Sequence, residues 1–127
     1  MARKHLSTGS PFEEALSYSR AVVQGDWCFM AGVTGYDYDR MVMPEDIGAQ
    51  VTQSFETVNK VLGEAGFKPQ DIVRVTHYIA DRSLVDAASP AIGNALKDIR
   101  PAATMVLAEL MEPNMLYEVE VTAYKGG

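Results

Sequence analysis

Two glutamates near the end of the sequence are the strongest candidates for chemistry. Glu118 and Glu120 alternate with Val119 and Val121. Because successive side chains of a strand point to opposite faces, this pattern places both carboxylates on one face of a predicted strand. A carboxylate in a cleft can orient or deprotonate a water molecule, and burial suits it to that role by raising its pKa. A solvated strand face without any function explains the same pattern, so both interpretations stand at this point.

Arg20 and Arg100 are the cations that we expect near these carboxylates. Arg20 begins the first predicted strand, and Arg100 precedes Pro101 ahead of a later strand. Guanidinium groups bind carboxylates through two parallel hydrogen bonds. Either arginine is therefore a candidate to hold the acidic end of a substrate, and either can equally be a surface charge or one half of an ion pair.

The remaining reactive side chains do not assemble into a site. His5 and His77 are the only histidines, and with Cys28 they form no cluster spaced like metal ligands, so we expect no metal site. His77 alternates with apolar residues of a predicted strand, which favours a buried histidine in the core or an interface over a catalytic base. Cys28 lies between two aromatic residues and is interpreted as part of the core.

The composition disfavours several classes of protein. The chain of 127 residues fits one domain spanning 1–127, with 47% apolar and 22% charged residues, which is typical of a soluble globular protein. Its net charge of −6 repels phosphates, so nucleic-acid binding is not expected. No apolar run is long enough for a membrane span or a signal peptide, so we expect a cytoplasmic protein without a membrane partner.

Two segments in the first half of the chain have clear structural patterns. Residues 19–33 predict a hairpin, because two apolar runs flank the turn pair Gly25-Asp26. A helix is expected to have residues 44–46 in its first turn, where proline and acidic residues are favourable, and to end at Gly66. Its apolar residues recur at steps of three and four and form one stripe, made of Ile47, Val51, Phe55, Val58, Leu62 and Ala65.

The second half of the chain predicts three strands and a helix. Residues 72–80 are rich in β-branched residues and form the first of these strands. A helical pattern follows over 83–98, but Pro90 interrupts it, so a short turn followed by a helix from Pro90 is the alternative. Two strands follow at 104–110 and 117–124. One face of the first strand is predicted to carry Val73, Val75, His77 and Ile79.

The expected order is therefore two strands, a helix, a strand, a helix and two strands. With antiparallel pairing at both ends, this order predicts an α+β fold in which a sheet carries both helices on one face. The opposite face needs a cover. The large apolar side chains of the hairpin favour its burial against other subunits.

Short motifs spread over residues 18–124 form a recognisable set. Each motif is weak alone, but their order and spacing are specific together and agree with the predicted elements. They are Tyr18, Gly25-Asp26-Trp27, Ala31-Gly32, Gln50, Ala65-Gly66, Asp71-Ile72-Val73, Pro101-Ala102 and Glu118-Val119-Glu120. In these motifs the chain resembles the RidA family, also called the YjgF family.

This resemblance implies a fold, an assembly and an activity. Members of the family have a chorismate-mutase-like fold with a mixed sheet, and they form homotrimers with a central barrel and three clefts between neighbouring subunits. Active members hydrolyse imines and enamines to keto acids and ammonia without a cofactor. By resemblance, we expect a cofactor-free homotrimer whose ligand is a small carboxylate-bearing or amino compound.

Two residues match cleft residues of the family, and a third position does not match. Tyr18 falls where the family has its cleft tyrosine, and Glu118 falls where the family has the glutamate that orients water. Ala103 stands after Pro101-Ala102, where the family has the arginine that binds the substrate carboxylate. An alanine cannot form a bidentate salt bridge. Another group would therefore have to hold the acidic end of a substrate.

The working interpretation is a divergent imine or enamine hydrolase whose substrate differs from the usual one. Glu118 would position the water, and Tyr18 would line the cleft. Thr104 would hydrogen-bond the substrate, and Arg20 or Arg100 would hold its acidic end. The alternative is a non-catalytic trimer that binds ligands or proteins on the same fold. Endoribonuclease activity, attached to some relatives, fits poorly with an acidic chain.

Overall fold

Residues 2–126 are the part of the chain that this computed structural model describes, and they form one mixed sheet with helices beside it. The strands are β1 (Lys4–Leu6), β2 (Ala21–Gln24), β3 (Trp27–Met30), β4 (Val33–Thr34), β5 (Ile72–Ile79), β6 (Ala102–Leu107) and β7 (Tyr117–Tyr124). The helices are α1 (Pro11–Leu16), α2 (Ile47–Ala65) and α3 (Val85–Leu96), with short 3-10 helices at Pro69–Asp71 and Arg82–Leu84. Within residues 2–126, no helix combines the length and apolar character that crossing a membrane requires.

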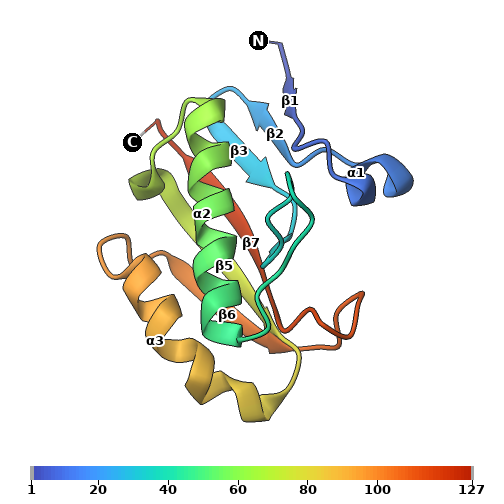
Figure 1. Ribbon diagram of the computed structural model, residues 1–127. Helices are drawn as coiled ribbons and strands as arrows, with labels where there is room; N and C mark the ends of the chain where they lie inside the picture. The colour runs from blue at the N-terminus through green and yellow to red at the C-terminus, as the bar shows by residue number, and fades with distance from the viewer. Residues whose placement is uncertain (1, 127) are drawn as a thin grey trace.

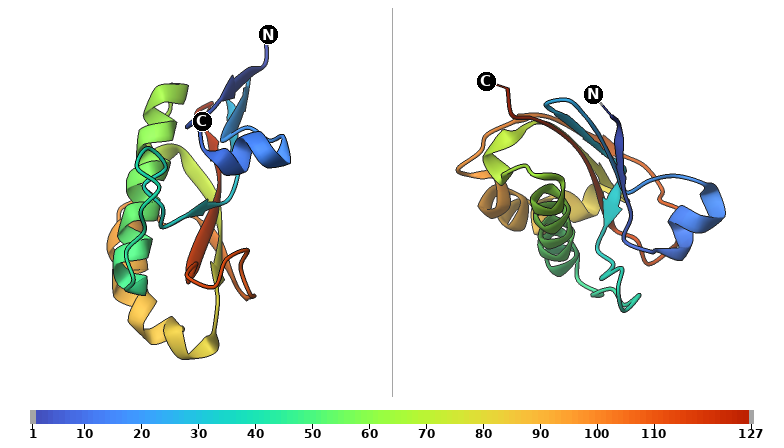
Figure 2. Two further views of the ribbon diagram at one scale, coloured as in Figure 1. Left: turned by 45° about the vertical axis from the view of Figure 1, so that its right-hand side comes forward. Right: turned by 90° about the horizontal axis from the view of Figure 1, so that it is seen from above.

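The sheet lies between two helical regions. Helices α2 and α3 pack side by side over one face (Figure 1), whereas α1 lies on the other side of the sheet (Figure 2). The core fills the space between the sheet and α2, where valines from both layers, such as Val58 and Val119, are completely buried. The predicted α+β fold, a mixed sheet with two helices packed on one face, is confirmed.

The hairpin forms at the predicted turn. Gly25 has a φ of +60°, which lies in the left-handed region that glycine adopts at no steric cost, and β2 and β3 pair antiparallel on either side of it. Strand β1 was not predicted, and it pairs antiparallel with β2. Cys28 of β3 is buried in the core, as its neighbours in the sequence indicated.

Helix α2 has its predicted apolar stripe, which is buried along its whole length, and its predicted C-terminal cap at Gly66. The predicted start was wrong, because residues 44–46 precede the helix. Asp46 is the N-cap, with an extended backbone and a side chain that accepts a hydrogen bond from the backbone N–H of Ala49 at 3.0 Å. The acidic side chain therefore stabilises the helix from outside its first turn.

Strand β7 has the predicted bounds and the predicted alternation of buried and outward-facing residues. Strand β5 differs from the prediction at Val73, which was predicted to share a face with Val75 but is 42% exposed, whereas Val75 is buried. The pairing of β5 with β7 shifts by one residue between Ile72 and Arg74. A bulge of this kind inserts one extra residue, so Ile72 takes the buried position and Val73 turns outward.

The predicted antiparallel pairing of the last two strands was wrong. Strand β6 pairs in parallel with β5, and β7 lies between β3 and β5, antiparallel to both. The segment from β5 through α3 to β6 is a crossover connection, which places two consecutive strands side by side in parallel. Strand β7 then joins this unit to the hairpin.

Helix α3 runs through Pro90 without interruption, so the alternative of a helix that begins at Pro90 was wrong. Proline cannot donate the hydrogen bond that the carbonyl of Asp86 would otherwise accept. Asp86 and Pro90 both lie on the exposed side of the helix, where water can solvate the freed carbonyl. Ser89 donates its hydroxyl to the carbonyl of Val85 at 2.7 Å in the same turn.

The face of the sheet opposite α2 and α3 carries both carboxylates and large apolar side chains. We call it the open face. The pairing of Phe29 with Thr122 places the side chains of Phe29 and Trp27 on the same face as Glu118 and Glu120. Trp27 is 41% exposed and Phe29 is 49% exposed. The whole of β6 is also exposed, so this region combines polar groups with uncovered apolar surface.

Candidate functional site

Glu118 is the centre of the candidate site. In β7 it pairs with Thr34 of β4 on one side and with Tyr78 of β5 on the other, and its side chain is partly buried. Burial raises the pKa of the Glu118 carboxyl above its ordinary value, the positive charge of Arg20 opposes this rise, and the neighbouring Glu120 adds to it. Glu120 itself is exposed, so the two predicted carboxylates differ in environment.

Gly32 provides the surface on which the Glu118 carboxylate rests. A Cβ atom at position 32 would overlap Oε2 of Glu118 and would lie only 2.8 Å from its Cδ. The carboxylate therefore packs directly against the backbone between β3 and β4. Because any side chain larger than a hydrogen atom would displace it, the glycine at this position makes room for the carboxylate to lie here. Gly32 was predicted as part of a family motif, and its contact with Glu118 was not predicted.

Arg20 lies beneath this site and has no exposed surface. Its Nη1 donates a hydrogen bond to the carbonyl of Gly32 at 2.6 Å and a longer one to the carbonyl of Ala31 at 3.4 Å. Its Nε lies 3.5 Å from Oε2 of Glu13, an ion-pair distance without hydrogen-bond geometry. The expectation that Arg20 lies near the carboxylates agrees with this arrangement, but its burial leaves it no contact with solvent.

Two tyrosine rings lie beside the Arg20 guanidinium. Its central carbon is 4.7 Å from the ring centroid of Tyr38 and 5.6 Å from that of Tyr18, distances at which aromatic rings attract a cation. Nη2 of Arg20 is also 3.4 Å from the hydroxyl of Tyr18. Burial raises the pKa of Tyr18, and the charge of Arg20 opposes the rise. Tyr18 is only partly buried, so it links the buried cation to the surface.

Tyr38 connects this cluster to the strand that pairs with Glu118. Its hydroxyl accepts a hydrogen bond from the backbone N–H of Thr34 at 2.9 Å and lies 3.0 Å from the Thr34 hydroxyl. Tyr38 was not predicted as a site residue, because it lies in a loop whose fold could not be predicted. No sequence signal identifies the contact of Tyr38 with Arg20, since the two residues meet only in the tertiary structure.

Glu13 supplies the negative charge beneath Arg20 and was also missed from the sequence. It belongs to α1, which Ser10 caps by accepting a hydrogen bond from the backbone N–H of Phe12. Burial alone would raise the pKa of Glu13, but hydrogen bonds from Thr8 and Ser7, together with the charge of Arg20, bring it below its usual value. The buried Glu13 carboxylate is therefore stabilised as an anion by hydrogen bonds and by Arg20.

The structure does not bring Thr104 or Arg100 to Glu118 of the same chain. Thr104 lies on the open face of β6, in one row with Thr76 and Glu120. With strands about 4.8 Å apart and a rise of about 3.3 Å per residue, its Cα is roughly 12 Å from that of Glu118. Arg100 lies before β6, with a left-handed φ of +53°, and is farther from Glu118 than Thr104 is.

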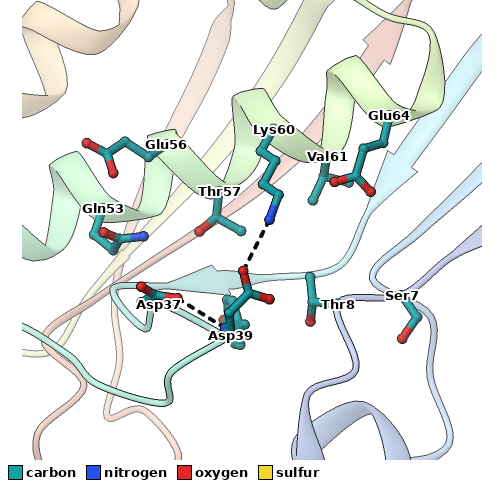
Figure 3. A pocket seen from close by; sticks show the side chains of 11 residues that line it. Ser7, Thr8, Asp37, Asp39, Gln53, Glu56, Thr57, Lys60, Val61 and Glu64 are labelled. Carbon is teal, nitrogen blue, oxygen red and sulfur yellow. Dashed lines mark hydrogen bonds and ion pairs between the residues drawn. The ribbon is translucent and has the colours of Figure 1, made fainter.

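A separate polar pocket of about 310 Å³ lies behind this cluster, between the loop that carries Tyr38 and the outer side of α2 (Figure 3). Asp37, Asp39 and Glu56 line it, and Lys60 of α2 reaches Asp39 at 3.2 Å. Tyr38 is shared between this pocket and the cluster around Arg20. None of the residues predicted for the site lines the pocket.

His77 is a buried core residue, as its position in the strand indicated. One ring nitrogen, Nδ1, lies 2.6 Å from the hydroxyl of Tyr117, and burial lowers the pKa of the imidazole. Over residues 2–126, no group of three or more histidine, cysteine or acidic side chains is arranged to hold a metal ion. The chemistry available around Glu118 is therefore that of a partly buried carboxylate held near a buried cation.

Comparisons with known proteins agree with one another. The family model described as Endoribonuclease L-PSP matches residues 8–125. A RutC family protein from Aquifex aeolicus is 32% identical over 110 residues, which cover 85% of this chain and 88% of that protein. The 2-iminobutanoate/2-iminopropanoate deaminase of Salmonella typhimurium is 27% identical over 111 residues, covering 85% and 87%. The crystal structure of a YjgF family member from Mycobacterium tuberculosis has a TM-score of 0.88 at 35% identity and covers 98% of this chain and 100% of that one.

Proposed function

Because the chain belongs to the endoribonuclease L-PSP family, the family of the RidA, YjgF and RutC proteins, we propose that it hydrolyses a small imine, enamine or related amino compound. The products are a carbonyl compound and ammonia, and the reaction uses no cofactor. The proposed site is the cleft between subunits of a homotrimer. The observation that carries the proposal is the partly buried carboxylate of Glu118, held against Gly32 on the open face.

Glu118 is the proposed acid–base group. A carboxyl whose pKa is raised by burial accepts and returns protons closer to neutral pH than an exposed carboxyl does. In the proposed reaction, Glu118 removes a proton from water as the oxygen adds to the carbon of the C=N bond. It then returns that proton to the nitrogen, which gives a carbinolamine. Glu118 next moves the hydroxyl proton of the carbinolamine to the nitrogen, so the C=O bond forms as the C–N bond breaks and ammonia leaves. One water molecule is consumed for each imine.

Tyr18, Thr104 and Arg100 are the proposed substrate-binding groups. Thr104 and Arg100 lie far from Glu118 of their own chain, so in a cleft between subunits they would act from the neighbouring subunit. Uncovered apolar side chains such as Phe29 support association through the open face. Tyr18 would line the cleft, since it is the partly exposed member of the cluster around Arg20.

The proposal is tested with 2-imino acids generated in solution by an amino-acid oxidase and trapped with semicarbazide. The protein is expected to shorten the lifetime of the imine. Glu118→Gln keeps the size of the side chain but removes its basicity, and should lower kcat/KM by about 100-fold or more. Glu120→Gln is the matched control, because Glu120 lies on the same face but is exposed. Unchanged activity in Glu118→Gln would contradict the assignment.

The alternative function is a non-catalytic trimer that binds small ligands or proteins. Position 103 favours it, because Ala103 lies exposed on β6 and offers no guanidinium for a substrate carboxylate. This alternative predicts that small keto acids bind without any imine turnover, as calorimetry and the trapping assay together would detect. A ribonuclease is less consistent with a net charge of −6.

A further inference from the structure

Arg20 is placed where it cannot bind a substrate directly. The whole residue is buried, and its guanidinium is occupied by two backbone carbonyls, Glu13 and two tyrosine rings. A ligand could reach it only if Tyr18 or the backbone between β3 and β4 moved away. Burying a cation this completely is costly unless its partners compensate the lost hydration. Any role of Arg20 must therefore be one that it performs from its buried position.

Gly32 is the residue that connects Arg20 to Glu118. Nη1 of Arg20 donates to the carbonyl of Gly32 at 2.6 Å, and the Glu118 carboxylate packs where a side chain of residue 32 would stand. The planar guanidinium also reaches the adjacent carbonyl of Ala31. One side chain therefore fixes the two peptide groups that support the carboxylate, a task for which a rigid, multiply donating group is suited.

The charge of Arg20 acts on the same carboxylate. The groups that face Glu118 are Glu120 of its own strand, Tyr78 of β5 and Thr34 of β4. Glu120 and burial both favour the protonated form of Glu118, whereas Arg20 favours the ionised form. Arg20 is the cation that acts on Glu118. Its attraction for the Glu118 carboxylate is weakly screened because Arg20 is buried.

We propose that Arg20 is a positioning residue for Glu118, fixing the Gly32 backbone against the carboxylate and supplying a positive charge that favours its ionised form. This inference rests on the proposed function for the role of Glu118 in catalysis. In this role Arg20 acts inside the protein, and other groups bind the acidic end of a substrate. Glu13 holds the guanidinium in place from below.

The test measures the pKa of the Glu118 carboxyl by NMR titration of ¹³C-labelled glutamate, with the signal assigned from Glu118→Gln. In Arg20→Gln the pKa is expected to rise, and in Arg20→Lys, which keeps the charge, it should rise less. Arg74→Gln is the matched control. Arg74 lies on the open face but two rows along the sheet from Glu118, so its removal should leave the titration unchanged.

Removing Arg20 alone leaves Glu13 buried without its cation, so Arg20→Gln is also combined with Glu13→Gln to preserve folding. The double variant removes both charges and should show the same upward shift of the Glu118 pKa. An unchanged pKa in a folded Arg20→Gln variant or in the folded double variant would overturn the proposal. Because the titration needs no substrate, this outcome is distinguishable from a failure of the proposed hydrolase activity.

Kinetics provide the second readout. If Arg20 positions Glu118, Arg20→Lys should lower kcat by about 10-fold or more with KM little changed. The reason is that a misplaced Glu118 carboxylate weakens stabilisation of the transition state but not binding of the substrate. The pH–rate profile should move in the same direction as the pKa measured by NMR. A large rise in KM at constant kcat would instead mean that Arg20 contacts the substrate.

Discussion

Glu118 and Glu120 show how strongly the surroundings of a residue determine its chemistry. They are two positions apart on one face of β7, but Glu118 packs against Gly32 near a buried arginine, whereas Glu120 is exposed. The alternation of the strand predicted their shared face. It could not predict the difference between them, which depends on the backbone between β3 and β4.

The residues beneath Glu118 were only partly predictable. The position of Arg20 near the carboxylates followed from its place at the start of a hairpin strand. Its burial did not, because Glu13 and Tyr38 come from a six-residue helix and an irregular loop that carry no periodic pattern. Arg100 lies far from Glu118 of the same chain because β6 is at the sheet edge, so its predicted role in a cleft between subunits stays a prediction.

His77 should make stability depend on pH. Burial lowers its pKa in the folded protein, so below about pH 6.5 the unfolded chain binds more protons than the folded one. The free energy of unfolding should therefore fall as the pH drops below this value, by up to about 1.4 kcal/mol per pH unit. Urea unfolding at pH 7.5 and 5.5 measures the effect.

His77→Gln is the control for this pH dependence. The variant keeps a hydrogen-bonding side chain near Tyr117 but cannot titrate, so its overall stability can fall while its stability changes less between the two pH values. Glu118 titrates with the opposite sign, because its folded-state pKa is raised, and it does so in both proteins. An equal pH dependence in both proteins would show that His77 does not contribute.

At the scale of elements, the stability of α2 depends on its N-cap Asp46, which the sequence pattern predicted to lie in the first turn of the helix. Asp46→Ala removes the acceptor for the Ala49 backbone N–H and should lower the free energy of unfolding by about 1 kcal/mol. Thermal or urea unfolding measures the loss. Glu45→Ala, one residue earlier and outside the helix, should change the stability much less. Equal losses in both variants would mean that the general acidity of this segment matters, not the cap.

The periodic elements were predictable because their pattern is local. Strand pairing was not predictable, since it depends on contacts between distant segments. The stripe of α2 and the alternation of β7 follow from spacing alone. The position of β7 between β3 and β5 follows from the crossover that moves β6 to the edge, and the exposure of Val73 follows from a bulge. Both depend on a neighbouring strand that the local sequence does not specify.

At the scale of the molecule, the open face should control self-association in the proposed homotrimer. Phe29 is an exposed aromatic residue on this face, and Phe29→Asp would place a charge in the proposed interface. Sedimentation velocity is expected to show a trimer for the unmodified protein and smaller species for the variant. Asn59→Asp, on the exposed side of α2, adds the same charge elsewhere and should leave the assembly intact. A monomeric unmodified protein would refute the assembly.

During synthesis, the sheet cannot close before its central strand has been made. Strand β7 is the last strand in the chain order, yet it forms the hydrogen bonds that connect the hairpin to β5. Until it emerges, the nascent chain has two separate groups of strands with unpaired edges, which are sites of aggregation. The sheet can therefore be completed only after residues 117–124 have been made, and until then the nascent chain has exposed strand edges.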